Sequence, residues 1–228
     1  MPPLLAQQTI VAQFEELSAH IDRARWFRTQ AFSEATALIP SYLNDLFGDW
    51  YAGVSGRLDV KRWERLAAVV EDVADGPHQT PTYVRSGTPF LTVLNIASGR
   101  IDFRDHKCIT AEDHAHYQGR AKAERGDVLL SKDGTIGVPC LVDTDREFSF
   151  FVSVALIKPS HEVLDGEYLT WVLRTPYLQN RMKERSRGDM IRHLVLREIR
   201  DLTVPIPTCL SNARSYQPSS NCCIKSRV

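Results

Sequence analysis

The sequence predicts an α+β chain in which a long coiled-coil helix precedes a mixed α/β domain with short strands and peripheral helices. Apolar residues near the N-terminus repeat with a helical spacing over many turns, whereas the middle of the chain alternates short strand-like runs with turn and helix-capping signals. The last residues are rich in serine and have no apolar period, which predicts disorder. We therefore expect a helix at residues 1–50, a folded domain at 54–207 and a disordered tail at 210–228.

The predicted helix carries a narrow apolar seam. Its apolar side chains follow a 4-3-4-3 spacing that only Arg28 interrupts, over roughly five turns or more. Such a seam is typical of a coiled coil, and the alternative is one amphipathic helix lying on its own domain. Pro40 is expected to kink the last turns and Gly48 to end the helix. The seam residues expected to contact a partner helix are Ile10, Phe14, Leu17, Ile21, Ala24, Ala31, Ala35, Leu38 and Tyr42.

The first part of the domain has the pattern of strands separated by turns. After Trp63, the run ERLAAVVEDV is compatible with a strand or with a helical turn. Residues 75–89 are dense in turn-forming residues and predict a long exposed loop. The segments PFLTVLNI and ASGRIDF that follow have the pattern of a strand, a turn and a second strand.

Helix-capping residues occur at several positions in the rest of the domain. Thr110, Asp165 and Thr175 each precede a helical pattern and are suited to N-cap positions, with a proline following Thr175 as the first helical residue. LVLREIRDL predicts a last short helix, and TVPIP an extended exit held by its prolines. Between these helices, SFFVSVALIKP predicts a buried strand.

Residues 126–137, GDVLLSKDGTIG, raise the choice between a phosphate-binding loop and a hairpin. A P-loop needs a lysine directly after its second glycine and a helix that begins there, whereas Lys132 precedes Gly134 and the next residues are strand-like. We therefore predict two strands, VLLS and TIGVPCLV, joined by a short loop in which Gly134 has a positive φ. The tip is expected to offer Lys132, Asp133 and Thr135 to solvent or to a ligand.

A basic run occurs near the end of the domain. QNRMKERSRGDMIRHL contains five Lys or Arg residues and one histidine against two acidic residues, and Gly188 is expected to end the helix within it. The end of a basic helix and the loop after it are suited to clamping a nucleic-acid backbone, although such a run is also typical of a solvated face. Polar residues of the 75–89 loop add a second set of side chains that are suited to contacting bases.

Composition restricts the possible functions. The 28 basic and 28 acidic residues give no net charge, so a nucleic-acid binder with this composition must concentrate its basic residues locally or rely on the charge of a partner. No apolar stretch approaches the length of about 20 residues that a membrane span needs, and the N-terminus lacks the features of a signal peptide. The five cysteines form no CxxC pair, which predicts neither a disulfide framework nor a zinc site. We expect a cytoplasmic protein that does not bind membranes.

No pattern in the sequence favours an enzyme. On a helix, His114 and His116 would lie about 200° apart around the axis and would not share a metal. The sequence has no GxSxG or HExxH motif, and its carboxylates have no catalytic spacing. A small stand-alone enzyme is therefore less favoured than a nucleic-acid-binding protein or a helix-mediated interaction protein.

Several stretches, taken in order, resemble the specificity (S) subunit of type I restriction-modification systems. PTYVRSGTPFLTVLNIASGRI and ERGDVLLSKDGTIG are similar to two motifs of that family's target recognition domains. EYLTWVLRTPYLQNRM and RGDMIRHLVLREIRDLTVPIP resemble its closing segments, with Asp189 where Ser or Thr is usual. PPLLAQQTIVAQFEEL resembles the start of its conserved helix, with Ala6 in place of Glu. The resemblance covers about residues 2–207.

The resemblance implies a non-catalytic subunit that recognises DNA. In that family, two recognition domains alternate with two conserved helices that pack as an antiparallel coiled coil. Each domain recognises one half of a split double-stranded target, and the helices dock methyltransferase (M) subunits. S-adenosylmethionine, ATP and Mg belong to the M and restriction (R) subunits, so this chain is expected to bind no cofactor itself. A second copy, or another half of the S subunit, is an expected partner through the N-terminal helix.

This chain departs from the complete arrangement. Its PPLL and VPIPTCL segments look like two copies of one junction, so it is expected to contain a single helix and a single recognition domain. It would then be a half-sized subunit that dimerises, or the C-terminal part of a split or decayed gene. The change of composition at SNARSYQPSSNCCIKSRV favours a second hypothesis, a truncated, inactive fragment that acts at most as a helix-mediated interaction module.

Three segments are expected to face the DNA: the 75–89 loop, the 132–135 tip and the 186–193 loop. Arg and Lys would position the backbone, and His, Gln, Thr, Asn and Asp would contact bases. The candidate DNA-binding residues are His78, Gln79, Thr80, Tyr83, Arg85, Asn95, Lys132, Asp133, Thr135, Arg185, Arg187, Arg192 and His193.

Overall fold

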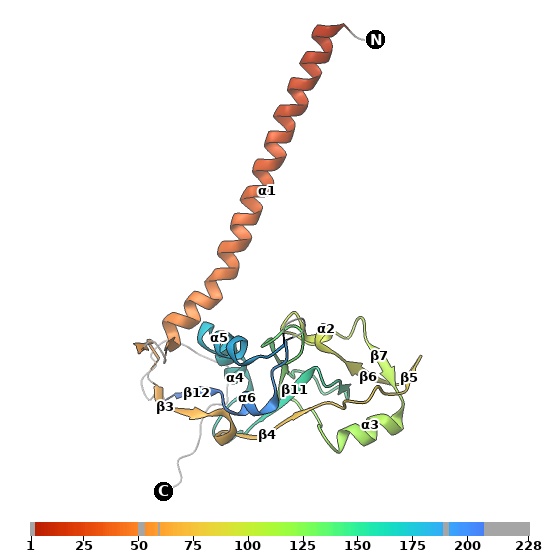
Figure 1. Cartoon of the computed structure of the whole chain (residues 1–228), viewed down its shortest axis with the longest axis vertical. Helices are drawn as coiled ribbons and strands as arrows, with labels where there is room; N and C mark the ends of the chain where they lie inside the picture. The colour runs from red at the N-terminus through yellow and green to blue at the C-terminus, as the bar shows by residue number, and fades with distance from the viewer. Residues whose placement is uncertain (1–2, 50–52, 59, 189–191, 208–228) are drawn as a thin grey trace. The chain divides into compact units, whose positions relative to one another are not determined.

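The computed structural model describes residues 3–49, 53–58, 60–188 and 192–207. The chain divides into two compact units, Met1–Tyr42 and Leu43–Val228. A long helix is followed by short strands and short helices, so the predicted α+β class is confirmed (Figure 1). No helix of the described ranges is long and apolar enough to cross a membrane. The predicted disordered tail lies outside the described residues.

Helix α1 spans Leu4–Phe47 and contains Pro40. It ends where predicted, because Gly48 has a φ of 71°, a left-handed conformation that glycine adopts readily at helix ends. The nine predicted seam residues are all exposed on α1. Phe32 and Ile39, which the prediction left out, are exposed as well, and at about 100° per residue they fall on the same side of the helix. The last turns of α1 contribute Leu43 and Phe47 to the core of the second unit.

An antiparallel four-stranded sheet forms the centre of the domain, in the order β4–β11–β8–β9. Alternate side chains of β8 and β11 point to opposite faces, as strand geometry requires. Val128 and Leu130 pack in one apolar cluster and Leu129 in another, so both faces of this sheet are buried. The strands are β4 (Val70–Asp75), β11 (Val154–Pro159), β8 (Val128–Ser131) and β9 (Pro139–Leu141).

A second four-stranded sheet has the order β10–β6–β7–β5. Its β10 runs parallel to β6, and the other pairs are antiparallel. Phe90, Ile109 and Tyr117 form a small buried cluster against it. The strands are β10 (Ser149–Phe150), β6 (Thr88–Leu91), β7 (Lys107–Ile109) and β5 (Tyr83–Val84).

Helices α3 (Ala111–Gln118), α4 (Gly166–Leu173) and α5 (Pro176–Arg185) begin at the predicted capping residues. The side chain of Thr110 accepts a hydrogen bond from the backbone N–H of Asp113 at 3.2 Å, and Asp165 from that of Tyr168 at 2.9 Å. Thr175 accepts from Leu178 N at 3.4 Å. The predicted last short helix is α6 (Leu196–Arg200), which begins without a side-chain cap.

The two ends of the domain pair with one another. The predicted extended segment TVPIP is β12 (Thr203–Pro207), and it runs antiparallel to β3 (Val60–Arg65). The run after Trp63 contains both of the proposed conformations, because β3 leads through the short 3-10 helix η1 (Leu66–Ala68) into β4. A two-stranded sheet of β1 (Gly48–Asp49) and β2 (Val54–Ser55) follows α1.

The structure corrects three predicted elements. The residues VLNI form helix α2 (Val93–Ile96) and not a strand, because Thr92 and Asn95 make a capping box, and ASGRIDF contains no strand. The single strand predicted at SFFVSVALIKP is divided into β10 and β11, which belong to different sheets. The predicted 75–89 loop contains β5 and the start of β6.

Both cysteines of the described ranges, Cys108 and Cys140, are free thiols. Cys140 is fully buried in the apolar cluster beside β8, and burial raises the pKa of its thiol to about 12. A thiol with such a pKa carries almost no thiolate near neutral pH, so Cys140 acts as a small apolar side chain.

Candidate nucleic-acid interface

A group of charged side chains centres on Asp75, the last residue of β4. Its side chain is 7% exposed, and its carboxylate accepts a hydrogen bond from Arg120 Nη2 at 2.7 Å. Lys132 Nζ lies 3.5 Å from the same carboxylate and His78 Nε2 lies 3.8 Å from it. A buried carboxylate needs such partners because loss of hydration disfavours its charge. Asp75 therefore has three basic partners, of which Arg120 and Lys132 come from segments distant in sequence.

The same group of contacts extends into the hairpin and the basic segment. Lys132 Nζ lies 3.5 Å from Asp133 Oδ2, and Asp133 Oδ1 lies 2.9 Å from His193 Nδ1. The backbone reinforces this connection, because Leu194 N donates to Lys132 O at 2.8 Å. The structure thus brings together the three segments that were predicted to face DNA. We call this group the Asp75 network; it comprises Asp75, His78, Arg120, Lys132, Asp133 and His193.

The prediction that the hairpin tip offers Lys132 to solvent is wrong. Lys132 is 7% exposed, because its ammonium group lies between the carboxylates of Asp75 and Asp133. The loop is also longer than predicted, since the second strand begins only at Pro139. Gly134 has the predicted positive φ, at 74°, and Thr135 is exposed.

The exposed ends of the Asp75 network are two histidines and one arginine. The side chains of His78, Arg120 and His193 are 69%, 54% and 54% exposed. Each presents N–H groups to solvent, and such groups can donate to phosphate oxygens or to acceptor atoms on base edges. The carboxylates of Asp75 and Asp133 thus position these solvent-accessible hydrogen-bond donors.

The rest of the 75–89 segment adds exposed polar groups. Gln79, Thr80 and Arg85 are exposed, and Tyr83 is 41% exposed with Lys107 Nζ 4.2 Å above its ring. The segment is held to α3 by a hydrogen bond of 2.7 Å from Thr82 N to the Asp113 carboxylate. These side chains stay candidates for DNA contacts.

Asn95 has a structural role in this fold. It is 6% exposed, and its side-chain amide donates to the carbonyls of Asp102 and Asp105 at 3.1 and 2.7 Å. Its carbonyl oxygen accepts from Thr92 N at 2.9 Å. Because these bonds occupy the amide and burial shields it, the expectation that Asn95 is presented to DNA does not hold.

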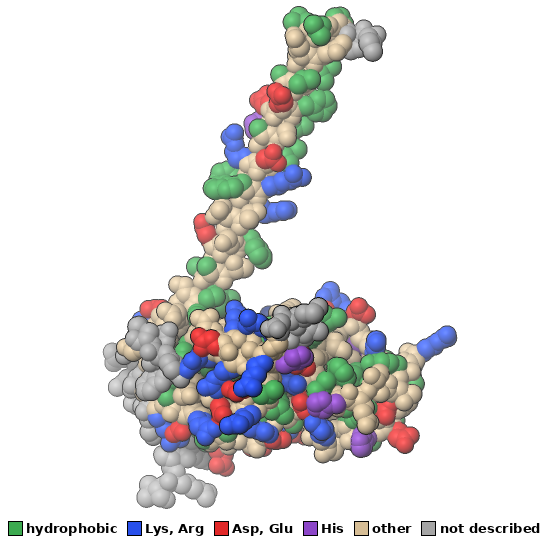
Figure 2. Space-filling view, in the orientation of Figure 1, with side chains coloured by type: hydrophobic (Ala, Val, Ile, Leu, Met, Phe, Trp, Pro, Cys, Tyr) green, Lys and Arg blue, Asp and Glu red, His purple; other side chains and the backbone are tan. Residues whose placement is uncertain are grey.

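The three arginines of the basic run that were predicted to contact DNA differ in their exposure to solvent. Arg185 is partly buried and connects α5 to α6, with Nη1 3.6 Å from Glu198 Oε2. Arg192 is exposed, and its guanidinium donates to the carbonyl of Lys183 at 3.1 Å, near the end of α5. Arg187 is exposed, and its backbone exchanges two hydrogen bonds with His193, at 2.9 and 2.7 Å. Figure 2 shows Lys and Arg side chains gathered on this face of the domain, over α5 and α6.

Sequence reasoning missed Arg120. It follows α3 in a segment with no recognisable motif, and it reaches Asp75 from 45 positions along the chain. Its Nε also donates to the Asp75 carbonyl at 3.1 Å. No sequence signal marks a pair so distant, because only the arrangement of the two sheets brings α3 and β4 together.

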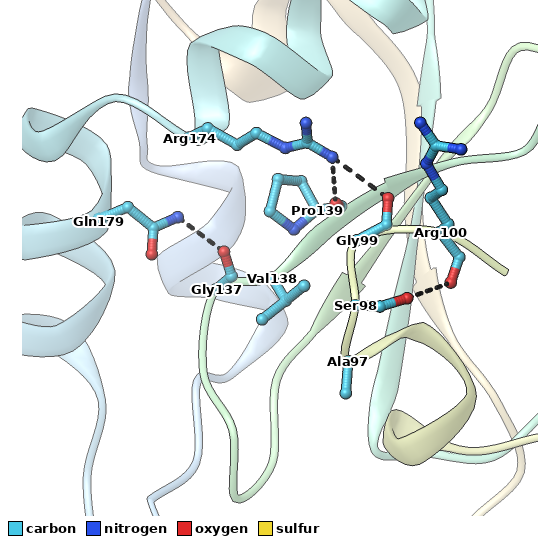
Figure 3. A pocket seen from close by; sticks show the side chains of 9 residues that line it. All are labelled: Ala97, Ser98, Gly99, Arg100, Gly137, Val138, Pro139, Arg174 and Gln179. Atoms are coloured by element: carbon cyan, nitrogen blue, oxygen red, sulfur yellow. Dashed lines mark hydrogen bonds between the residues drawn. The ribbon is translucent and has the colours of Figure 1, made fainter. Parts of the chain in front are cut away.

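A cavity of about 380 Å³ lies between the hairpin, the turn after α2 and helices α4 and α5 (Figure 3). Arg174 reaches across it to the carbonyls of Gly99 and Pro139, at 3.2 and 3.5 Å. Gln179 donates to the carbonyls of Gly137 and Leu173, both at 2.7 Å. These side chains thus hold the hairpin and the α2 turn against the helices, which is a structural role.

No group of three or more His, Cys, Asp or Glu residues in the described part of the chain is placed to hold a metal ion. His114 and His116 lie on α3, and His114 Nδ1 is 2.9 Å from the Ser149 hydroxyl.

Comparison with known proteins gives three informative matches, although no family model matches the chain. Over 125 residues it is 25% identical to the specificity subunit of the type I restriction enzyme EcoBI of Escherichia coli, a match that covers 55% of this chain and 26% of that subunit. The HsdS subunit of Thermoanaerobacter tengcongensis has a TM-score of 0.52 at 21% identity. A chain solved in work on complex assembly and conformational transition of the type I R-M system has a TM-score of 0.66 at 23% identity. Both structural matches cover 91% of this chain and 48% of the solved chain.

The long helix and the two sheets are thus similar to the fold of a solved HsdS subunit, and the sequence is similar to that of a type I restriction-modification specificity subunit. The resemblance predicted from the sequence is thereby confirmed. The chain spans about half the length of the two solved chains that share its fold.

Proposed function

We propose that this chain recognises one half of a split double-stranded DNA target, as part of a type I restriction-modification complex. It would direct the methyltransferase and restriction subunits to that target without catalytic activity of its own. S-adenosylmethionine, ATP and Mg would be bound in those partner subunits. The DNA-facing surface would consist of the exposed ends of the Asp75 network, the 79–85 side chains and the loop that carries Arg187.

The convergence of three distant segments on the Asp75 network carries this proposal. Asp75, Lys132 and His193 come from separate parts of the chain, yet a continuous series of contacts connects them. Buried ion pairs hold exposed donors at fixed positions, and fixed donors are what discrimination between base edges requires. The neutral overall charge is compatible with DNA binding, because several Lys and Arg side chains lie close together on the face of the domain that Figure 2 shows.

Methylation of host DNA tests this function directly. With the methyltransferase present, adenine methylation would be mapped in strains with and without the gene. Loss of a split motif on deletion is the expected result. A palindromic motif would mean that two copies act together, and an asymmetric motif would mean a different partner half. An unchanged map would contradict the proposal and favour a decayed fragment that acts through its helix.

We also propose that the exposed seam of α1 binds a partner helix. Its large apolar residues are solvent-exposed, with Phe14 67% and Ile21 43% exposed. A contiguous apolar face of this kind marks an interaction surface. Its coiled-coil spacing favours a second copy of the chain, with another S half or the M subunit as the alternatives.

A double variant of the seam is expected to dissociate the pair. In Phe14→Glu/Ile21→Glu, two apolar contacts per copy are lost, each of roughly 1.5–3 kcal/mol. The dissociation constant measured by sedimentation equilibrium should then rise at least about a hundredfold. Trp26→Glu is the matched control, because Trp26 is 57% exposed but lies on the opposite side of the helix. A wild-type chain that is monomeric alone, and pairs only with M or another half, would exclude self-association.

A further inference from the structure

A second basic surface lies outside the Asp75 network, where the end of β3, η1 and α6 meet. These elements enclose an open cavity of about 470 Å³. Its lining includes three arginines and one acidic residue, an excess of two positive charges, and the small side chains of Ala67 and Ala68 leave room above them. The charged lining residues are Arg65, Arg197, Arg200 and Asp201.

The three arginines are held to different degrees. Arg200 is fixed, because its guanidinium donates to the carbonyl of Val73 and lies 3.5 Å from the Asp72 carboxylate. Arg65 forms an ion pair with Asp201 while its side chain stays 67% exposed. Arg197 is exposed and makes no ion pair within the described residues. Guanidinium groups gathered around a hollow match the planar, multiple hydrogen bonding that phosphate oxygens accept.

Strand β4 connects this cavity to the Asp75 network. Asp72, whose carboxylate lies 3.5 Å from the Arg200 guanidinium of the cavity, and Asp75 of the network are three residues apart on β4, about 10 Å at ~3.3 Å per residue. One DNA strand has a phosphate about every 3.4 Å along the axis, so roughly three phosphates span that length.

We propose that Arg65, Arg197 and Arg200 form a site for backbone phosphates of DNA adjoining the segment that faces the Asp75 network. This inference rests on the proposed function, because that function makes DNA the ligand. Arg200 supplies a fixed donor, and Arg65 and Arg197 turn toward the phosphate oxygens. The site positions the duplex and carries no information about base sequence.

The salt dependence of DNA binding tests the site. Binding of the full-length chain to a duplex of arbitrary sequence would be measured by fluorescence anisotropy over a range of salt concentrations. Arg65→Gln/Arg197→Gln should make the negative slope of log K against log salt less steep by about 2, because each lost phosphate contact removes about 0.9 from its magnitude. Arg197→Glu alone breaks no ion pair among the described residues and should also make the slope less steep. The control Arg104→Gln/Arg125→Gln removes two exposed arginines that pair with Asp102 and Asp145 and line neither cavity.

The outcomes separate this inference from the proposed function. A less steep slope in both arginine variants but not in the control supports the phosphate site. This holds even if the wild-type chain prefers no DNA sequence, a result that would contradict the proposed function but not the phosphate site. An unchanged slope overturns the site, as does a wild-type chain that binds no DNA. Loss of binding to the methyltransferase without a change of slope also overturns it and assigns the cavity to a protein partner.

Discussion

Asp75→Ala is expected to lower the free energy of unfolding of the domain by about 3 kcal/mol, because removal of one member of a buried ion pair leaves the other charge uncompensated. Lys132 would be that charge, since its side chain is 9% exposed and the variant would leave it with Asp133 alone of its two carboxylate partners. Arg120 would lose its carboxylate partner and keep only its hydrogen bond to the backbone carbonyl of residue 75. Urea unfolding of the full-length chain would measure the loss.

Two further variants identify the cause of this loss. Asp75→Ala/Lys132→Met should regain part of the lost stability, because a buried apolar side chain leaves no charge unpaired. Asp145→Ala breaks an ion pair with Arg125 whose side chains are 80% and 54% exposed, so it should leave the unfolding midpoint unchanged. If Asp75→Ala unfolds at the same urea concentration as the wild type, the Asp75 network does not stabilise this domain.

Local chemistry explains which parts of the fold were predictable. Thr110, Asp165 and Thr175 each cap a helix by bonding a backbone N–H three residues along, and a sequence displays such a contact directly. The glycines at the end of α1 and in the hairpin loop were predictable for a similar reason, because a positive φ is a property of one position.

The wrong predictions concern residues whose conformation or exposure is determined by tertiary contacts. VLNI has the apolar pattern of a strand, but the Asn95 side chain binds two carbonyls of a later loop and thereby stabilises a helical turn. Lys132 was expected at a solvent-exposed tip, because no residue near it in the sequence indicates its ion pair with Asp75, which lies 57 positions earlier. The candidate site was therefore predictable as three segments, while the pairings that join them depend on the two sheets.

The largest effect on DNA binding is expected from Arg187→Glu/Arg192→Glu. Both side chains are exposed, and they flank the connection between the basic segment and the Asp75 network. Reversing two positive charges beside a DNA backbone replaces two attractions with two repulsions, so the affinity for duplex DNA should fall on the order of 100-fold at moderate salt. Anisotropy titrations of the full-length chain would measure the change. The effect should be smaller at high salt, where screening weakens charge contacts.

A companion variant separates sequence recognition from general attraction. His193→Ala removes an exposed donor but keeps the arginines, so affinity for unrelated DNA should change little, while preference for the motif found by methylation mapping should fall by roughly 1–3 kcal/mol. Arg187→Glu/Arg192→Glu should instead weaken binding to all sequences alike. If the charge reversal leaves affinity unchanged, DNA approaches another face of the domain. If His193→Ala leaves the preference unchanged, His193 contacts no base, and the exposed 79–85 side chains become the next residues to test.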